Sequence, residues 1–332
     1  MRRREDRDTN AARRILVTGG AGFIGASLVR ALEADGAAVT VVDDGRAAGT
    51  ALLDGVAARL VPGDLGLMAA NGDLQPLLAG TDAVVHLAAR TGVPASIADP
   101  AADYRDNVDA SLALLDLARR NGVGRFIFAS SNAAVGAAEG PISERTVPRP
   151  TSPYGAAKLA MEGYLSAYAA SYGMATVAIR FANAYGPYAL HKRSVIASFL
   201  LAGLKGRPLT VYGDGSQARD LVHVDDLVRL IRASLDAPGD RVAGQILQGG
   251  SGVRTPIGEL ARVVADVLGS DVAVVHEPAR TGDVAGAACD LSLSTELVGY
   301  RAQVELREGI SSVAAWFREA LDDPRLAPLA ER

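Results

Sequence analysis

Short apolar runs alternate with longer amphipathic segments through the first 180 residues of the chain. The first run, residues 15–17, has the composition of a buried strand, and apolar positions with helical spacing follow it between residues 23 and 32. Strands separated in this way by helical segments predict a parallel sheet with helices on both faces. The predicted strands are residues 15–17, 38–42, 59–64, 83–89, 125–129 and 175–180.

The same patterning predicts three further helices, over residues 101–120, from Ser152 onwards, and over 306–321. Ser152 is a favourable N-cap and Pro153 a favourable first-turn residue. In the last of these helices the apolar positions form a packing face. They are Ile310, Val313, Trp316, Phe317 and Leu321.

Between the first strand and the first helix stands the glycine-rich sequence TGGAGFIG, residues 18–25. Gly19 would permit a tight turn, Gly22 would let a pyrophosphate approach the backbone, and Gly25 would let the helix pack against the strand. The helix N-terminus offers unpaired N–H groups and a partial positive charge to phosphates. A structural glycine turn is the alternative, but the flanking strand and helix favour a dinucleotide-binding turn.

Asp43 ends the second strand. Its distance along the chain from the glycine turn is close to the roughly 20 residues expected of an acid that binds the adenosine ribose. A carboxylate there accepts hydrogen bonds from ribose hydroxyls and repels a 2′-phosphate, which favours NAD over NADP. Arg46 lies in the same loop and could instead meet a 2′-phosphate. Other polar or small residues also fall at the carboxyl ends of predicted strands, where ligands of such sheets bind. They are Asp64, Ala88, Ala89, Ser130 and Ser131.

Tyr154 and Lys158 are four residues apart in the helix that follows Ser152, so their side chains share a face. A nearby ammonium lowers a tyrosine pKa, which suits a general base acting near neutral pH. Tyr188 and Lys192 repeat the spacing, but they follow Gly186-Pro187 and precede a helix, so we do not expect a shared face there.

Together these motifs resemble the extended short-chain dehydrogenase/reductase family, and within it the nucleotide-sugar epimerases and dehydratases, over about residues 14–320. The resemblance implies an α/β fold with a Rossmann-type doubly wound parallel sheet and a smaller C-terminal α/β substrate-binding lobe. The NAD-binding domain would span residues 14–182 and the interleaved lobe mainly residues 183–332, after a disordered basic tail over residues 1–13.

The resemblance also implies catalytic roles for Ser131, Tyr154 and Lys158. Tyr154 would exchange a proton with a sugar hydroxyl, Ser131 would hold that hydroxyl, and Lys158 would bind the nicotinamide ribose. Ser130 competes with Ser131, which is preferred because it lies five residues before Gly136. The implied NAD-binding residues are Gly19, Gly22, Phe23, Ile24, Gly25, Asp43, Asp44, Asp64, Leu65, Leu87, Ala88, Ala89, Asn107, Tyr154 and Lys158.

For the substrate, Arg219 and Arg280 would clamp the diphosphate, since guanidinium groups pair phosphate oxygens bidentately. Tyr212 would lie near a uracil, and Asn183 would contact the substrate through its amide. The implied substrate-binding residues are Ser131, Asn132, Tyr154, Asn183, Val195, Tyr212, Arg219, Arg280 and Asp283.

Dehydratases of this group carry an Asp-Glu pair where this chain has Asn132 and Ala133, so elimination lacks its acid and base. Enzymes of this group that act on uronic acids need a cation for the sugar carboxylate, often an Arg at the position that Tyr188 occupies here. In this chain Lys192 or Arg193 could supply that cation instead. C4 epimerisation of a UDP-hexose or UDP-N-acetylhexosamine with bound NAD is therefore expected. UDP-glucuronate epimerisation or decarboxylation, NDP-sugar 4-ketoreduction and a non-catalytic NAD-sensing module are the alternatives.

Two positions near the expected site differ in size from common family residues. Ala287 would leave room for an acetamido group at C2 of the sugar. Val135 replaces the usual tyrosine before Gly136, and the loop could therefore differ in shape.

The composition of the chain bears on its expected partners, its metal and disulfide sites, and its location. The chain has 332 residues, a net charge of −4 with both signs interspersed, and 49% hydrophobic residues, so we expect neither a nucleic-acid nor a membrane partner. Cys289 is the only cysteine and the four histidines are scattered, so we expect no disulfide and no metal site. The first 14 residues lack the apolar stretch of a secretory signal, which favours a cytoplasmic protein. A homodimer is the family expectation.

Overall fold

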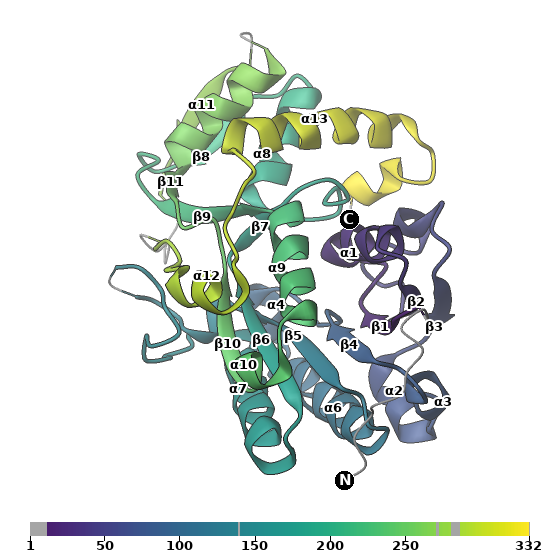
Figure 1. Cartoon of the computed structure of the whole chain (residues 1–332). Helices are drawn as coiled ribbons and strands as arrows, with labels where there is room; N and C mark the ends of the chain where they lie inside the picture. Colours follow the sequence, from purple (N-terminus) through teal and green to yellow (C-terminus); the bar gives the residue numbers. More distant parts are fainter. Residues whose placement is uncertain (1–11, 139, 270–271, 280–285, 332) are drawn as a thin grey trace.

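A computed structural model describes residues 12–138, 140–269, 272–279 and 286–331 (Figure 1). Seven parallel strands form the central sheet, in the order β10-β6-β5-β4-β1-β2-β3. The order reverses between β1 and β4, which opens a crevice at the carboxyl edge of the sheet. The strands are β1 (Arg14–Thr18), β2 (Ala38–Asp43), β3 (Arg59–Pro62), β4 (Ala83–His86), β5 (Arg125–Ser131), β6 (Ala175–Phe181) and β10 (Gln245–Gly249).

Six of these strands overlap the predicted runs, and the predicted doubly wound α/β fold is confirmed. The fourth strand is shorter than predicted, because it ends at His86 and residues 87–89 form a loop. β10 was not predicted. The helices around the sheet are α1 (Phe23–Ala34), α2 (Leu65–Asn71), α3 (Gln75–Leu78), α4 (Val93–Ala98), α5 (Pro100–Tyr104), α6 (Ala110–Arg120), α7 (Pro153–Tyr172), α9 (Val224–Asp236) and α10 (Gly239–Val242).

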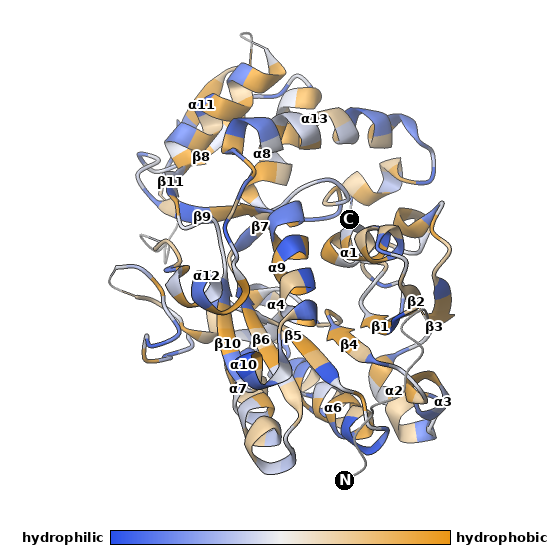
Figure 2. Ribbon diagram, viewed as in Figure 1, coloured by the Kyte–Doolittle hydropathy of each residue, from blue (hydrophilic) through white to orange (hydrophobic). Residues whose placement is uncertain are grey.

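Apolar side chains cover both faces of the sheet. In β1, Ile15 and Val17 point to one buried cluster, which includes α1 and α9, and Leu16 points to the other, which includes α6 and α7. This alternation explains why β1 reads as a continuous apolar run rather than as a half-exposed strand. The central strands are accordingly hydrophobic over most of their length (Figure 2).

The helix predicted over residues 101–120 is not regular. A π-helical turn, Arg105–Asp109, separates α5 from α6. Such turns are frequent at functional sites, and this one places the buried Asn107 toward the loop that follows β4.

The smaller lobe lies beyond the carboxyl edge of the sheet (Figure 1). It contains two small sheets, β11-β9-β7 and β12-β8. The chain returns from it to α9 and β10, which pack on the central sheet, so the two parts are interleaved. Its elements are β7 (Asn183–Tyr185), α8 (Val195–Leu204), β8 (Leu209–Tyr212), β9 (Ala218–His223), β11 (Arg254–Pro256), α11 (Ile257–Leu268), β12 (Val274–Glu277), α12 (Ser292–Val298) and α13 (Leu306–Asp322).

The predicted tail over residues 1–13 lies, up to residue 11, outside the described residues. Among the residues that are described, no helix combines the length and the apolar character that a membrane span requires.

Candidate active site

The glycine turn lies where β1 enters α1, with Gly22 as the N-cap residue and Phe23 and Ile24 in the first helical turn. Gly19 has a φ of +72°, and a Cβ atom there would lie 2.5 Å from the amide nitrogen of Ala88. A Cβ atom on Gly25 would lie 2.2 Å from the carbonyl oxygen of Gly19. A side chain is therefore excluded at Gly19 and at Gly25, which lets the turn pack closely and leaves the N-terminus of α1 open to a pyrophosphate.

Asp43 holds this turn against β2. Its Oδ2 accepts a hydrogen bond from the amide of Ala21 (2.9 Å) and its Oδ1 one from the amide of Gly45 (2.8 Å). Burial raises the pKa of Asp43, and the two amides oppose that shift. A carboxylate has about four lone-pair sites, so two stay available for the ribose hydroxyls that the sequence predicts it to bind.

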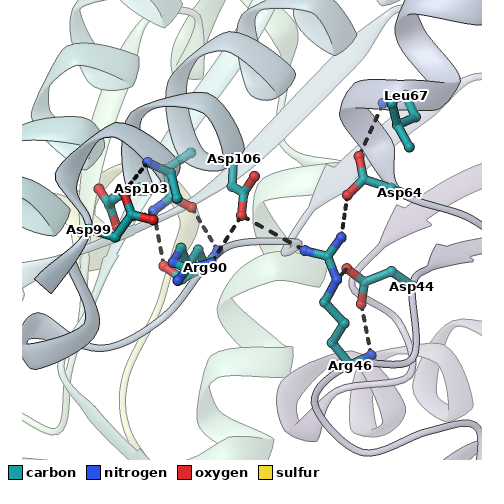
Figure 3. Close-up of polar contacts among 10 residues, drawn as sticks. Asp44, Arg46, Asp64, Leu67, Arg90, Asp99, Asp103 and Asp106 are labelled. Atoms are coloured by element: carbon teal, nitrogen blue, oxygen red, sulfur yellow. Dashed lines mark hydrogen bonds and ion pairs between the residues drawn. The ribbon is translucent and has the colours of Figure 1, made fainter.

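Arg46 is surrounded by carboxylates (Figure 3). Its guanidinium lies 3.1 Å from Asp44, 2.6 Å from Asp64 and 3.9 Å from Asp106. Asp64 also caps α2, which begins at Leu65, by accepting from the amide of Leu67 at 3.1 Å. Because three negative groups surround this one arginine, a 2′-phosphate would meet net negative charge there. The alternative role of Arg46 as an NADP anchor is therefore not supported.

The loop after β4 closes the other side of the glycine turn. The amide of Leu87 donates to the carbonyl of Thr18 (3.0 Å), and that of Ala88 to the Thr18 hydroxyl (3.3 Å). The same hydroxyl shares a 2.6 Å hydrogen bond with His86 Nδ1. Burial, with the charge of Lys158, lowers the pKa of His86 to about 3, so the ring is neutral. Ala89 follows in the half-buried part of this loop.

Asn107 fixes the end of this loop. Its Oδ1 accepts from the amide of Arg90 (2.8 Å), and its Nδ2 donates to the carbonyl of Arg90 (3.0 Å) and to Asp103 Oδ1 (2.9 Å). The amide is buried and engaged by these groups. Asn107 therefore shapes the cofactor-side loop, and a direct contact with NAD stays a prediction.

Tyr154 and Lys158 lie on α7, which begins as predicted with Ser152 accepting from the amide of Gly155 (3.1 Å). Lys158 Nζ donates to the carbonyl of Ala129 (2.8 Å) and lies 5.7 Å from the centroid of the Tyr154 ring. Burial lowers the pKa of Lys158 to about 8.

The expected pKa shift of Tyr154 is wrong in direction. Burial raises the pKa of Tyr154 to about 12, the charge of Asp103 adds to the rise, and a hydrogen bond with Ser131 opposes it. The cost of desolvating a phenolate outweighs these contacts. The Lys158 ammonium, directed at the Ala129 carbonyl, does not reverse that shift.

The two serines at the end of β5 have different partners. Ser131 accepts a hydrogen bond from the amide of Ala133 (3.1 Å), and its side chain is hydrogen-bonded to that of Tyr154. Ser130 donates to Glu162 Oε1 (2.6 Å), and Glu162 in turn accepts two hydrogen bonds from Arg180, at 2.9 and 2.8 Å. The geometry therefore brings Ser131, and not Ser130, to the tyrosine. The Glu162–Arg180 pair was not predicted, although an arginine within the apolar run of β6 was a signal for it.

Four of the predicted substrate-binding residues line one cavity of about 440 Å³ in the smaller lobe. They are Asn183, Val195, Tyr212 and Arg219. The Asn183 amide also donates to the carbonyl of Asp220 (3.2 Å). Arg280 and Asp283, the other members predicted for this lobe, lie outside the described residues.

Asn132 connects the catalytic strand to the smaller lobe. Its Nδ2 donates to Cys289 Sγ (3.2 Å), and the amide of Cys289 donates to Asp220 Oδ2 (2.8 Å). Asp220 also accepts from the amides of Ser251 (2.7 Å) and Gly252 (3.1 Å). Burial and the charge of Asp220 raise the pKa of Cys289, so the thiol stays protonated. These buried contacts of Asp220 and Cys289 were not predicted, because nothing local in the sequence marks them.

Three further positions can now be placed. Tyr188 has a φ of 69°, and its ring packs against Trp316, with the Arg30 guanidinium 4.7 Å from its centroid. It lies outside any helix, so the second Tyr-x-x-x-Lys copy has no shared helical face, as predicted. Val135 is fully buried and Ala287 is half-buried.

The described residues hold no group of three or more side chains suited to a metal ion.

A model of the NAD dependent epimerase/dehydratase family matches residues 15–249. The chain belongs to this family. The resemblance drawn from the motifs is thereby confirmed, and with it NAD as the cofactor and the assignment to the enzymes of the nucleotide-sugar epimerase group.

Individual members of the family are similar over most of their length. The UDP-glucose 4-epimerase of Mycolicibacterium smegmatis is 37% identical over 319 residues, which cover 92% of this chain and 98% of that protein. The structure of UDP-glucose 4-epimerase from Thermotoga maritima with UDP-glucose gives a TM-score of 0.84 at 33% identity, over 93% of this chain and 100% of that one. MoeE5 in complex with UDP-glucuronic acid and NAD gives 0.82 at 34%, over 93% and 100%.

Proposed function

We propose that this epimerase-family enzyme interconverts the C4 epimers of a UDP-hexose or UDP-N-acetylhexosamine through a 4-keto intermediate. The observation that carries the proposal is the placement of Ser131, Tyr154 and Lys158 at the carboxyl edge of the sheet, beside the glycine turn. Bound NAD would supply the hydride acceptor and donor for C4. Gly19, Gly22, Asp43 and Lys158 are the residues that we expect to hold it.

Tyr154 would take the proton of the 4-hydroxyl and return it in the second half of the cycle. Ser131 would position the sugar hydroxyl, because the Ser131 side chain is already hydrogen-bonded to that of Tyr154. The Lys158 ammonium would favour the phenolate over the phenol once substrate displaces water from the site. The raised pKa of Tyr154 makes its phenolate a stronger base but a less populated one, and makes its phenol a weaker acid for returning the proton to the product.

Asn132 and Ala133 support epimerisation over elimination. An amide cannot act as a general acid or base, and the Asn132 Nδ2 is already engaged by Cys289. Ala133 has no titratable group. The 5,6-elimination of a dehydratase would therefore lack both of its proton-transfer groups.

The uronate alternative keeps a specific observation in its favour. Lys192 follows the Tyr188 turn, and burial lowers its pKa. Such a lysine gains from meeting a carboxylate, because burial without one is costly. The similarity to MoeE5, which was solved with UDP-glucuronic acid, also favours it.

A panel of three substrates tests the proposal. UDP-glucose, UDP-N-acetylglucosamine and UDP-glucuronate are incubated separately without added reductant and followed by proton NMR. A galacto-isomer from either of the first two supports the proposal, and turnover of the glucuronate alone replaces it by the uronate reading. Accumulation of a 4-keto sugar with stoichiometric reduction of added NAD to NADH would indicate a 4-ketoreductase acting in its oxidative direction.

A cytoplasmic location stays a prediction.

We also propose that two copies of the chain form a dimer through α4, α5 and α7. Ile97, Tyr104 and Tyr164 are 60%, 54% and 41% exposed on these mutually packed helices. Large apolar side chains that stay exposed on packed helices are typical of interfaces between protein chains. Light scattering is expected to give a dimer that Ile97→Glu weakens, and a monomeric wild type would reject the pairing.

A further inference from the structure

Asp103 is a buried carboxylate to which none of the roles above assigns a task. It lies on α5 and is 1% exposed. Its Oδ1 accepts a hydrogen bond from Asn107 Nδ2 at 2.9 Å. Its Oδ2 is buried and has no hydrogen-bond partner among the residues that the structure describes. Aspartate is rarely buried to this extent without a compensating positive charge.

The buried cation on the neighbouring helix is Lys158. α5 packs against α7, and Lys158 is 2% exposed. Its ammonium donates to the carbonyl of Ala129 and lies 4.6 Å from the centroid of the Phe128 ring. Both contacts attract a cation, but neither group carries the unit negative charge that would balance it.

Two carboxylates act on the Lys158 charge, Asp103 more strongly than Glu162. Glu162 already has a cation of its own, because Arg180 binds both of its oxygens. Besides Lys158, the cation whose charge acts on Asp103 is Arg90, and the Arg90 guanidinium lies 3.7 Å from Asp106 (Figure 3). Asp103 is therefore the carboxylate whose charge is left to balance Lys158.

We propose that Asp103 is a positioning residue of the catalytic pair, the counter-charge that keeps the Lys158 ammonium protonated beside Tyr154. This inference rests on the proposed function, because Asp103 would act only through Tyr154 and Lys158. It would not touch the sugar or the cofactor.

The sign of its effect is the same on both groups. The negative charge of Asp103 raises the pKa of Lys158 and the pKa of Tyr154. The other charged groups around it are Arg90, Asp106 and Glu162, and His86 is neutral. Removing the Asp103 charge should therefore lower both pKa values, so that Tyr154 ionises and Lys158 loses its proton at lower pH.

The test is the pH dependence of kcat for Asp103→Asn, which keeps the size of the side chain and one oxygen acceptor for Asn107. Both limbs of the profile are expected to move to lower pH by about one unit. On the acid limb, where the ionisation of Tyr154 limits the rate, kcat is expected to rise several-fold at a given pH, with KM unchanged. Asp103→Ser repeats the measurement if the amide is not tolerated.

Asp109→Asn is the matched control. It removes one negative charge from the adjacent π turn. Asp109 is exposed there, and its side chain is hydrogen-bonded to Tyr104 and not to Tyr154 or Lys158. Its limbs should stay where they are in the wild type. A substrate-independent readout is the ultraviolet titration of tyrosinate, taken as the difference from Tyr154→Phe, which should also move to lower pH in Asp103→Asn.

A uniform loss of kcat with unmoved limbs, or a move to higher pH, would overturn the role of Asp103. The proposed function fails separately. If Tyr154→Phe keeps full activity, the catalytic assignment is wrong whatever Asp103 does. If Tyr154→Phe is inactive while the Asp103→Asn limbs stay in place, only the counter-charge is wrong.

Discussion

At the scale of single residues, burial decides the chemistry of the tyrosine-lysine pair. Each group carries a charge only in one protonation state, and desolvation disfavours that state in both. It raises the pKa of Tyr154 to about 12 and lowers the pKa of Lys158 to about 8. The sequence showed that the two side chains share a helical face, but it did not show how deeply the sheet buries them. That is why the expected direction for Tyr154 was wrong.

Tyr154→Phe is expected to lower kcat by about 10²- to 10⁴-fold, because it removes the proton-transfer group and little else. In the wild type, activity should rise with pH as Tyr154 gains phenolate character and level off above about pH 8, where the loss of the Lys158 proton offsets the further gain in phenolate. Steady-state rates over a pH series measure the rise and the point where it levels off. Full activity in Tyr154→Phe, or a rate that does not change with pH below pH 8, would contradict this account.

At the scale of elements, what could be predicted was local. The glycine turn, six strands and the Ser152 cap of α7 each depend on residues close in sequence, whose preferences survive in the fold. The π turn at Arg105–Asp109 depends on the Arg90 loop, which meets Asn107 only after folding. Periodicity alone could not reveal that interruption.

Gly25→Ala and Gly163→Ala separate a required helical glycine from a dispensable one. In α1, the new Cβ would lie 2.2 Å from the Gly19 carbonyl oxygen, whereas in α7 nothing lies within 4 Å of the Cβ position at Gly163. Gly25→Ala should displace the turn and abolish NAD binding. Gly163→Ala should raise the free energy of unfolding by about 0.5–1 kcal/mol. Calorimetric NAD titration and urea denaturation test this pair, and tight NAD binding by Gly25→Ala would disprove the role of the turn.

At the scale of the whole molecule, buried polar contacts join elements that lie far apart in the sequence. Glu162 on α7 ties Arg180 on β6 to Ser130 on β5, and Asp220 ties β9 to the segments around Ser251 and Cys289. The sequence did not reveal these contacts, since nothing local marks a charged residue as the partner of another one far along the chain. The lobe cavity was likewise expected only through the family resemblance.

Glu162→Gln should destabilise the protein by about 3–5 kcal/mol, because Arg180 would stay buried without its counter-charge. Asp266→Asn is the control: its ion pair with Arg307 is exposed, so it should cost less than about 1 kcal/mol. Urea denaturation of the two variants measures the difference. Equal, small effects would show that the buried pair is dispensable.

The most direct test of the central claim follows the hydrogen on C4. UDP-glucose carrying deuterium at C4 is incubated with the purified protein, without added NADH, and the product is examined by NMR. The account predicts a galacto-isomer that keeps the deuterium at C4, because the hydride leaves and returns within one active site. Loss of the label to water, or no isomer from any UDP-hexose or UDP-N-acetylhexosamine, would contradict it.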